Sequence, residues 1–221
     1  MIDLHFWPTP NGWKITIMLE ETGMAYRLVP IDIASGAQHE PDFRALSPNG
    51  RMPAILDHEG PDGAPLSIFE SGAILQYLGD KSGQFYPTER RARSQVDQWL
   101  FWQCAGLGPM AGQAAHFNYQ KDKIPYAIER YTNETRRLYG VLDRRLADAE
   151  YMAGDYSIAD MATWPWTRGY KGLGIDPAEY PNFDRWNKQV GAREAVAKGS
   201  AIGKDDFAQR QRELLSPGSP K

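Results

Sequence analysis

The sequence predicts an α/β domain followed by an all-helical domain, and two observations lead to this prediction. The first eighty residues mix short alternating, strand-like stretches with short helical ones, whereas the stretch from Glu89 onward is helical in pattern without a convincing strand. A change of structural class along a chain indicates a domain boundary. We therefore predict a first domain over residues 1–81, a linker over 82–88, a helical domain over 89–215 and a disordered tail over 216–221.

The first predicted elements are a strand, a helix and a second strand. Hydrophobic and polar residues alternate over residues 2–6, the period of a strand buried on one face. The turn-rich residues 7–12 follow, and hydrophobic residues then recur at helical spacing, with Asn11 as the expected N-cap and Gly23 as the C-terminal stop. Residues 26–33 form the second strand, and a right-handed crossover would make the two strands parallel.

In the rest of the first domain, the sequence pattern predicts a short helix, a hairpin and a longer helix. Residues 41–46 suit a short helix. The apolar runs 54–57 and 66–69, with the turn signal Pro-Asp-Gly at 61–63 between them, predict a hairpin. Residues 70–81 are helical in pattern. The order β-α-β-α-β-β-α is that of the thioredoxin-like fold.

Composition excludes several classes of function. With a net charge of −3 and 24% charged residues, the chain lacks the clustered basic face that nucleic-acid binding requires. It opens directly into a strand pattern without a signal peptide, and no stretch approaches the roughly 20 apolar residues of a membrane span. We therefore expect a cytoplasmic protein that does not bind nucleic acid or membranes.

Cysteine and histidine content argues against a disulfide framework and a metal site. The single cysteine, Cys104, excludes an internal disulfide and a Cys-x-x-Cys redox pair. It lies in an aromatic helix, where we expect a buried, inert thiol. The four histidines have no metal-ligand spacing, so we expect no metal.

Three places in the first domain suggest chemistry, and each also has a purely structural interpretation. Met52–Pro53 stands at the entrance to a strand, where a proline is expected in any case. At Glu70–Ser71, a helix N-terminus could bind a carboxylate while the glutamate takes an ammonium group, although Ser71 could also simply cap the helix. Hydroxyl and amide groups of Thr9–Asn11 could stabilise an anion at the first helix, or only form a capping turn.

These three places occur together, ahead of an all-helical domain, and the sequence thereby resembles the glutathione transferase family. Residues Ser47 to Leu56 are similar to the family's loop into a cis-proline strand, and Phe69 to Ile74 to its γ-glutamyl-binding turn. Tyr156 to Asp160 resembles the family's buried capping box, in which Asp160 is a folding device and not a catalytic acid. The resemblance covers nearly the whole chain.

Within the family, two stretches are most similar to the bacterial Nu class. They are Thr9 to Ile15 and the aromatic Gln98 to Gln103, followed by Gly106 to Met110. Fungal relatives of this class include a nitrogen-regulating prion protein. The resemblance implies a homodimer and glutathione-dependent disulfide-bond reductase activity without an essential protein cysteine.

The resemblance assigns roles to eight residues. Thr9 and Asn11 would lie near the sulfur of glutathione as the catalytic groups, and the main chain of Met52, held by cis-Pro53, would bind the cysteinyl backbone. The others would also bind glutathione: Glu70 and Ser71 at the γ-glutamyl end, Gln38 near the glycyl end, and Arg130, which could equally be a solvated helix residue. Where many members of the family have a tyrosine, serine or cysteine, this chain offers Thr9, so a mixed disulfide on the protein at that position is excluded.

The implied chemistry is stabilisation of a thiolate. A free thiol of pKa near 8.5 is only a few per cent ionised at pH 7. Lowering its pKa by about two units takes roughly 2.7 kcal/mol, which one or two hydrogen bonds to a charged acceptor supply. We expect bound glutathione thiolate to attack a disulfide substrate and leave glutathione disulfide or a mixed disulfide.

The sequence leaves rival functions open. Conjugation of glutathione to electrophiles and reduction of hydroperoxides use the same thiolate, and a non-catalytic glutathione-binding regulator is possible too. The aromatic residues Trp99, Phe101 and Trp102 fit core or dimer packing or a wall of the second-substrate site.

Overall fold

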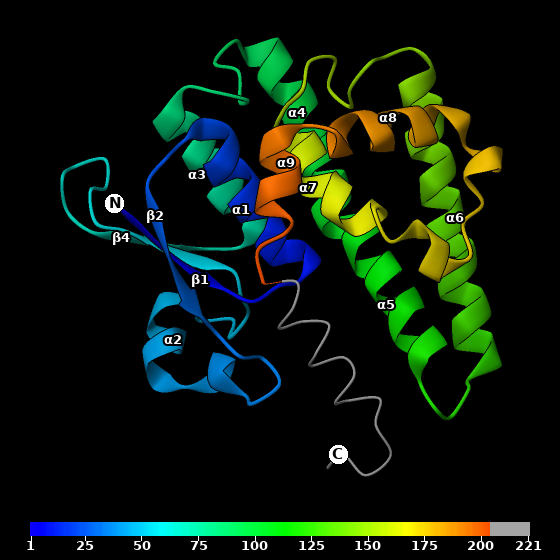
Figure 1. Cartoon of the computed structure of the whole chain (residues 1–221), viewed down its shortest axis with the longest axis horizontal. Coiled ribbons are helices and arrows are strands. Elements are labelled where there is room, and N and C mark those ends of the chain that lie inside the picture. Colours follow the sequence, from blue (N-terminus) through cyan, green and yellow to red (C-terminus); the bar gives the residue numbers. More distant parts are fainter. Residues whose placement is uncertain (204–221) are drawn as a thin grey trace. The chain divides into compact units, whose positions relative to one another are not determined.

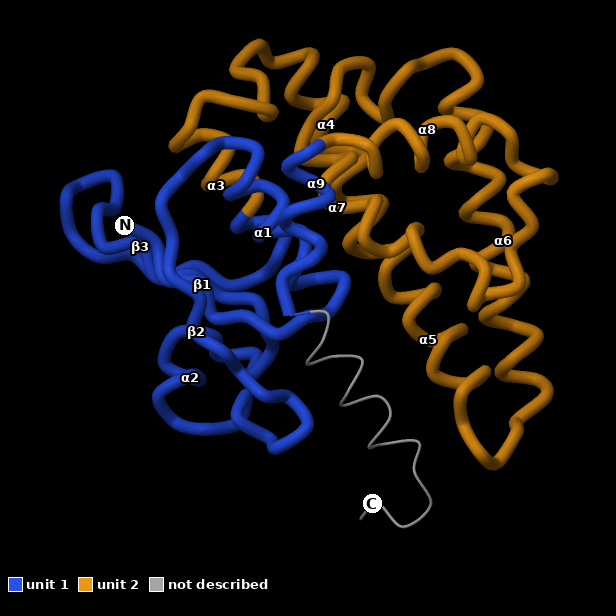
Figure 2. Tube along the Cα trace, viewed as in Figure 1, with its two compact units in different colours: residues 1–74, 194–221 blue, residues 75–193 orange. Residues whose placement is uncertain are grey.

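The computed structural model describes residues 1–203, which form two compact units (Figure 2). One unit comprises residues 1–74 together with the described residues from Glu194 onward, and the other comprises residues 75–193. These bounds differ from the predicted ones, because the division falls inside a helix at residue 74 and the last helix joins the first unit. A helical pattern shows that a segment is helical but not which core it joins. The predicted tail, 216–221, lies outside the described residues.

The first unit is built around a four-stranded sheet (Figure 1). Its elements are β1 (Ile2–Phe6), α1 (Pro10–Thr22), β2 (Tyr26–Pro30), a 3-10 turn η1 (Ala37–His39), α2 (Pro41–Leu46), β3 (Ala54–Asp57), β4 (Leu66–Phe69), the start of α3 (Ser71–Ser82) and α9 (Glu194–Gly199). The strand order is β2-β1-β3-β4, with β1 and β2 parallel and the other pairs antiparallel. This confirms the thioredoxin-like fold.

Two local predictions in this unit are wrong in detail. The N-cap of α1 is Thr9, not Asn11, because Pro10 occupies the first helical position, where its missing N–H is not needed. Strand β2 ends at Pro30 instead of residue 33, since proline cannot donate to the sheet ladder. Gly23 ends α1 in the left-handed conformation (φ 66°), as predicted.

Helix α1 is buried almost all round. Every residue from Gly12 to Leu19 is buried, and Ile15, Met18 and Leu19 are fully inaccessible. The sheet covers one side of α1, and α9 packs on it from the other end of the chain (Figure 1). The Thr16 hydroxyl donates to the carbonyl of Gly199 at 2.8 Å, and the Trp13 indole donates to the carbonyl of Ile202 at 3.0 Å. Both ends of the described chain therefore build the surroundings of this helix.

The second unit is helical, as predicted, and its described residues contain only two isolated β-bridges. Its elements are the rest of α3, α4 (Arg90–Trp102), a π-helical segment η2 (Gln103–Leu107), α5 (Gly108–Tyr119), α6 (Pro125–Ala147), α7 (Ile158–Thr167), two 3-10 turns, η3 (Tyr170–Leu173) and η4 (Pro177–Glu179), and α8 (Pro181–Gly191). Leu138, Tyr139 and Leu142 of α6 are buried, as are Phe183 and Trp186 of α8. These side chains form part of the helical core.

The predicted capping box opens α7. The Ser157 side chain accepts from the backbone, and Asp160 accepts from the Ser157 amide. The fully buried Asp160 also accepts from the Met152 amide at 3.0 Å and from the Trp186 indole at 2.8 Å. Burial raises the pKa of this carboxyl to about 6. Asp160 thus ties three segments together, which fits a folding role.

Candidate functional site

The strand register brings the predicted residues of the first unit to one end of the sheet. His5 pairs with Ala54, and Ala54 pairs with Phe69. The segment that follows β1, the one that precedes β3 and the one that follows β4 therefore lie next to one another. These segments carry Thr9–Asn11, Met52–Pro53 and Glu70–Ser71. Three motifs that are distant in sequence are thus adjacent in the fold.

The Thr9 hydroxyl is held by two contacts. Its oxygen accepts from the Gly12 amide at 3.3 Å, and the hydroxyl donates to the Met52 thioether at 3.5 Å. Because the amide can only donate, the proton of Thr9 stays available for an acceptor near Met52. A thioether is a weak acceptor, so a thiolate at this place would be a stronger one. Asn11, the second residue of α1, is partly exposed in the same first turn.

The peptide bond between Met52 and Pro53 is cis, as the resemblance implied. Met52 packs against a small cluster of buried residues formed by Ile31, Phe43 and Ala54. Hydrophobic packing of Met52 therefore holds the loop that leads into β3.

Glu70 and Ser71 form the turn into α3. Glu70 has a left-handed backbone (φ 69°), which is unusual for a non-glycine residue, and its carbonyl accepts the first helical bond from the Ile74 amide. The helix begins at Ser71, not at Glu70 as predicted. The exposed Glu70 carboxylate accepts from the Asn49 side chain at 3.3 Å, while Ser71 is buried. An exposed acid beside a helix N-terminus can take both charges of an amino acid's zwitterionic end.

Sequence reasoning missed Lys14. This lysine is only 2% exposed, and its ammonium donates to the Ser71 hydroxyl oxygen at 3.1 Å. The signal was its position between Trp13 and Ile15 in a helix whose neighbouring residues are hydrophobic. A lysine at such a position is seldom buried without a partner.

Gln38 lies in η1, after β2, and its side-chain oxygen is buried with no hydrogen-bond partner among residues 1–203. Gly50 approaches it closely, because a Cβ added there would lie 3.3 Å from the Gln38 carbonyl oxygen. Gln38 therefore borders the loop that leads to Met52.

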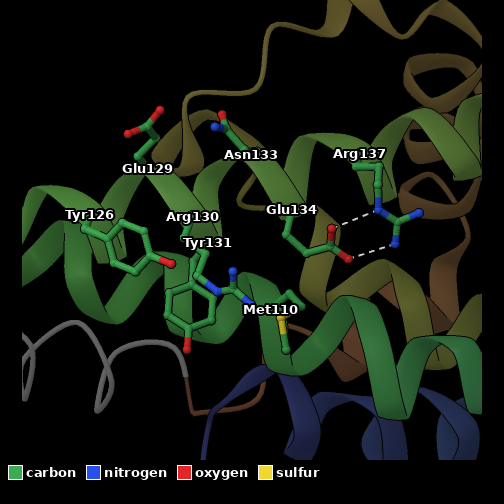
Figure 3. A pocket seen from close by; sticks show the side chains of 8 residues that line it. All are labelled: Met110, Tyr126, Glu129, Arg130, Tyr131, Asn133, Glu134 and Arg137. Carbon is green, nitrogen blue, oxygen red and sulfur yellow. Dashed lines mark hydrogen bonds and ion pairs between the residues drawn. The ribbon is translucent and has the colours of Figure 1, made fainter.

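Arg130 belongs to the second unit, where it lines a cavity of about 750 Å³ between α5 and α6. Figure 3 shows Arg130 extending from α6 toward Met110 of α5. Tyr126 and Tyr131 add aromatic surface, and Glu134 forms a two-bonded ion pair with Arg137 (2.7 and 2.8 Å). Arg130 is thus the one predicted site residue that lies outside the first unit.

Other side chains considered from the sequence lie in the second unit. Cys104, in η2, is half-buried rather than fully buried as expected, and its thiol donates to the Gln103 side chain at 3.5 Å. Trp99 and Trp102 pack edge to face, whereas Phe101 is 62% exposed.

Over residues 1–203, no group of three or more His, Cys, Asp or Glu residues could hold a metal ion. No helix in that part of the chain is long and apolar enough to cross a membrane.

Comparison with known proteins identifies the family. The model of the glutathione S-transferase N-terminal domain matches residues 1–80, and that of the C-terminal domain matches residues 107–194. The disulfide-bond oxidoreductase YfcG of Escherichia coli K12 is 51% identical over 201 residues, covering 90% of this chain and 94% of YfcG. This chain belongs to the glutathione S-transferase family.

Other members of the glutathione S-transferase family are similar over most of their length. The disulfide-bond oxidoreductase YghU of Escherichia coli K12 is 41% identical and covers 92% of this chain and 75% of YghU. A family member from Pseudomonas fluorescens, solved with two glutathione bound, has a TM-score of 0.86 at 44% identity, covering 90% and 92% of the two chains. A glutathione transferase from Pseudomonas putida, solved with one glutathione disulfide per subunit, has a TM-score of 0.86 at 42% identity, covering 91% of each.

Proposed function

We propose that this chain is a glutathione-dependent disulfide-bond reductase. The observation that carries the proposal is the Thr9 hydroxyl, whose oxygen accepts from the Gly12 amide and whose proton is left to donate beside Met52. The names of YfcG and YghU and the glutathione disulfide in the Pseudomonas putida structure support it. The substrates are glutathione and a small-molecule disulfide.

In the proposed reaction, the Thr9 hydroxyl and Asn11 stabilise bound glutathione as its thiolate. The thiolate attacks one sulfur of the disulfide, a new sulfur–sulfur bond forms, and the other sulfur leaves as a thiolate that takes a proton from water. The product is a mixed disulfide of glutathione, which a second glutathione converts to glutathione disulfide and a free thiol. No cysteine of the protein takes part.

The remaining predicted residues bind the rest of glutathione. Glu70 and Ser71 take the γ-glutamyl end, the Met52 main chain takes the cysteinyl backbone, and Gln38 takes the glycyl end. The side-chain oxygen of Gln38, buried and without a hydrogen-bond partner among residues 1–203, supports its part, because it could accept from the peptide N–H of the glycyl residue. Arg130 lies in the second unit, and its part in binding glutathione stays a prediction.

Replacing the hydroxyl tests the mechanism directly. Thr9→Val keeps the branched shape but removes the donor, so kcat/KM for glutathione-dependent reduction of hydroxyethyl disulfide should fall roughly 10- to 100-fold. Asn11→Ala should also lower it. Thr22→Val is the matched control, because it removes a hydroxyl that bonds the Met18 carbonyl at the other end of α1. The ultraviolet absorbance of bound thiolate, followed against pH, should show a raised thiol pKa only in the site variants.

Cys104→Ala is the decisive comparison. We expect unchanged turnover; loss of activity in this variant alone would refute the scheme. Parallel assays with a chloronitrobenzene and an organic hydroperoxide measure the rival conjugation and peroxidase activities.

The regulatory alternative has a relative of its own. The "Transcriptional regulator URE2" of Saccharomyces cerevisiae is 37% identical, with this chain spanning 64% of its length. A protein that binds a glutathione resin but turns over none of these substrates would favour the regulatory alternative.

Class, assembly and location remain predictions from the sequence. We place the chain in the Nu class and expect a homodimer in the cytoplasm. Sedimentation velocity over a range of protein concentrations would measure its oligomeric state.

A further inference from the structure

Lys14 carries a buried ammonium group to which the proposed function gives no role. It lies in α1, one turn beyond the Thr9–Asn11 segment, and is 2% exposed. Its bond to the Ser71 hydroxyl oxygen (3.1 Å) joins α1 to the first residue of α3. Lys14 also makes a further interaction besides this hydrogen bond. A buried charge is expensive, and a buried hydrophobic side chain of the same volume would avoid this cost.

The hydrogen bond from Lys14 to Ser71 determines in which direction the Ser71 hydroxyl can bond a second group. An ammonium group has three donors and no acceptor, so the Ser71 oxygen must accept from Lys14. A hydroxyl has one proton, which is therefore left to donate elsewhere. Lys14 thus makes Ser71 a donor, just as the Gly12 amide makes Thr9 one. Both hydroxyls at this end of the sheet are prepared to meet an anion.

We propose that Lys14 is a positioning residue that selects the α-carboxylate of the γ-glutamyl group. It does so by orienting the Ser71 proton toward that carboxylate and by placing a positive charge one hydroxyl away from it. This inference rests on the proposed binding of glutathione. The N-terminus of α3 alone would attract an anion. The added ammonium raises the affinity for that particular carboxylate.

An analogue isolates this contact. γ-Aminobutyryl-cysteinyl-glycine is glutathione without the α-carboxylate, and it keeps the ammonium group, the thiol and the glycyl end. Calorimetric titration of the wild-type protein should give a Kd for glutathione roughly 10- to 100-fold lower than for the analogue. In Lys14→Met this ratio should fall by about tenfold, with the analogue bound as in the wild type. A merely structural lysine would change both affinities alike.

Two further variants complete the design. Ser71→Ala should reduce the ratio in the same way, and the double variant should be no worse than the weaker single one, since the two groups act as a unit. Lys81→Met, which removes an exposed lysine from the last turn of α3, should leave the ratio unchanged. An unchanged ratio in Lys14→Met would overturn the inference. If the wild-type protein bound neither ligand, the proposed function itself would fail.

A measurement on the wild-type chain covers the case in which Lys14→Met does not fold. Lysine labelled with ¹⁵N should show one slowly exchanging ammonium resonance, from the buried Lys14. Saturation with glutathione should shift this resonance, and saturation with the analogue should not. If neither ligand shifted this resonance, the proposed role of Lys14 would be refuted.

Discussion

At the scale of single residues, hydrogen-bond direction and charge pairing decide what each polar group does. Asp3 in β1 is an example that lies away from the proposed chemistry. Its buried carboxylate receives two bonds from the Arg27 guanidinium (2.9 and 2.6 Å), and one oxygen lies 3.0 Å from the His58 ring. These contacts, chiefly the bonds from Arg27, lower the pKa of Asp3 to about 2.

This lowered pKa predicts a pH dependence of stability. In the unfolded chain an aspartate titrates near pH 3.9, so the paired carboxylate stabilises the fold above about pH 4. The contribution is lost as the pH falls from about 4 to about 2. Because Arg27 is largely exposed, we expect Asp3→Asn to lower the free energy of unfolding by only about 1–2 kcal/mol at pH 7. Urea unfolding of both proteins should show this difference shrinking below pH 4; a constant difference would contradict the assignment.

Residues that belong to a local sequence motif could be proposed for the site from the sequence. Met52–Pro53, Glu70–Ser71 and the turn at Thr9 each break a regular pattern, and their order identified the family. Lys14 could not be proposed in this way, because its proposed role depends on a contact with Ser71, 57 positions away. The N-cap of α1 was predicted at Asn11 but lies at Thr9, and propensity could not separate them because both residue types cap helices.

At the scale of elements, the sequence predicted nearly every strand and helix of the first unit, but not the partner of the last described helix. Helix α9 lies against α1 with almost no space between the backbones. A Cβ added to Gly199 would lie 2.7 Å from the Ile17 nitrogen and 2.8 Å from its Cα. Only glycine allows this approach, and the Thr16 bond to the Gly199 carbonyl depends on it. Nothing in the local sequence of α9 indicates so specific a partner.

Gly199→Ala should therefore weaken the packing of α9 on α1. Because the overlap is with backbone atoms, which cannot rotate away, we expect a loss of roughly 1–3 kcal/mol in the free energy of unfolding. Gly169→Ala is the control, since a Cβ there meets nothing within 4 Å. Thermal denaturation of the two variants would measure the difference. Equal melting temperatures would show that α9 adapts without cost.

At the scale of the whole molecule, the two compact units do not follow the order of segments along the chain. The hydrogen bond from Thr16 to Gly199 joins residues 183 positions apart, within the first unit. Helix α8, the neighbour of α9 in sequence, belongs to the second unit. Such a division is invisible to pattern reasoning, which assigns a segment to the domain that surrounds it in sequence.

Native-state hydrogen exchange can test this division. Groups of residues that open together exchange with one common free energy. The amides of α9 should share that free energy with α1 and differ from those of α8. In Gly199→Ala, exchange should accelerate in α1 and α9 together. Exchange of α9 in step with α8 would contradict the assignment.

The docking of α9 on α1 also sets an order of events during synthesis. Helix α1 leaves the ribosome well before the helix that covers it, since Thr16 and its partner Gly199 are 183 positions apart. At roughly 5–20 residues per second, α1 waits on the order of ten seconds for that cover. During this interval the nascent chain exposes the apolar surface that α9 later hides, which is the kind of surface that chaperones bind.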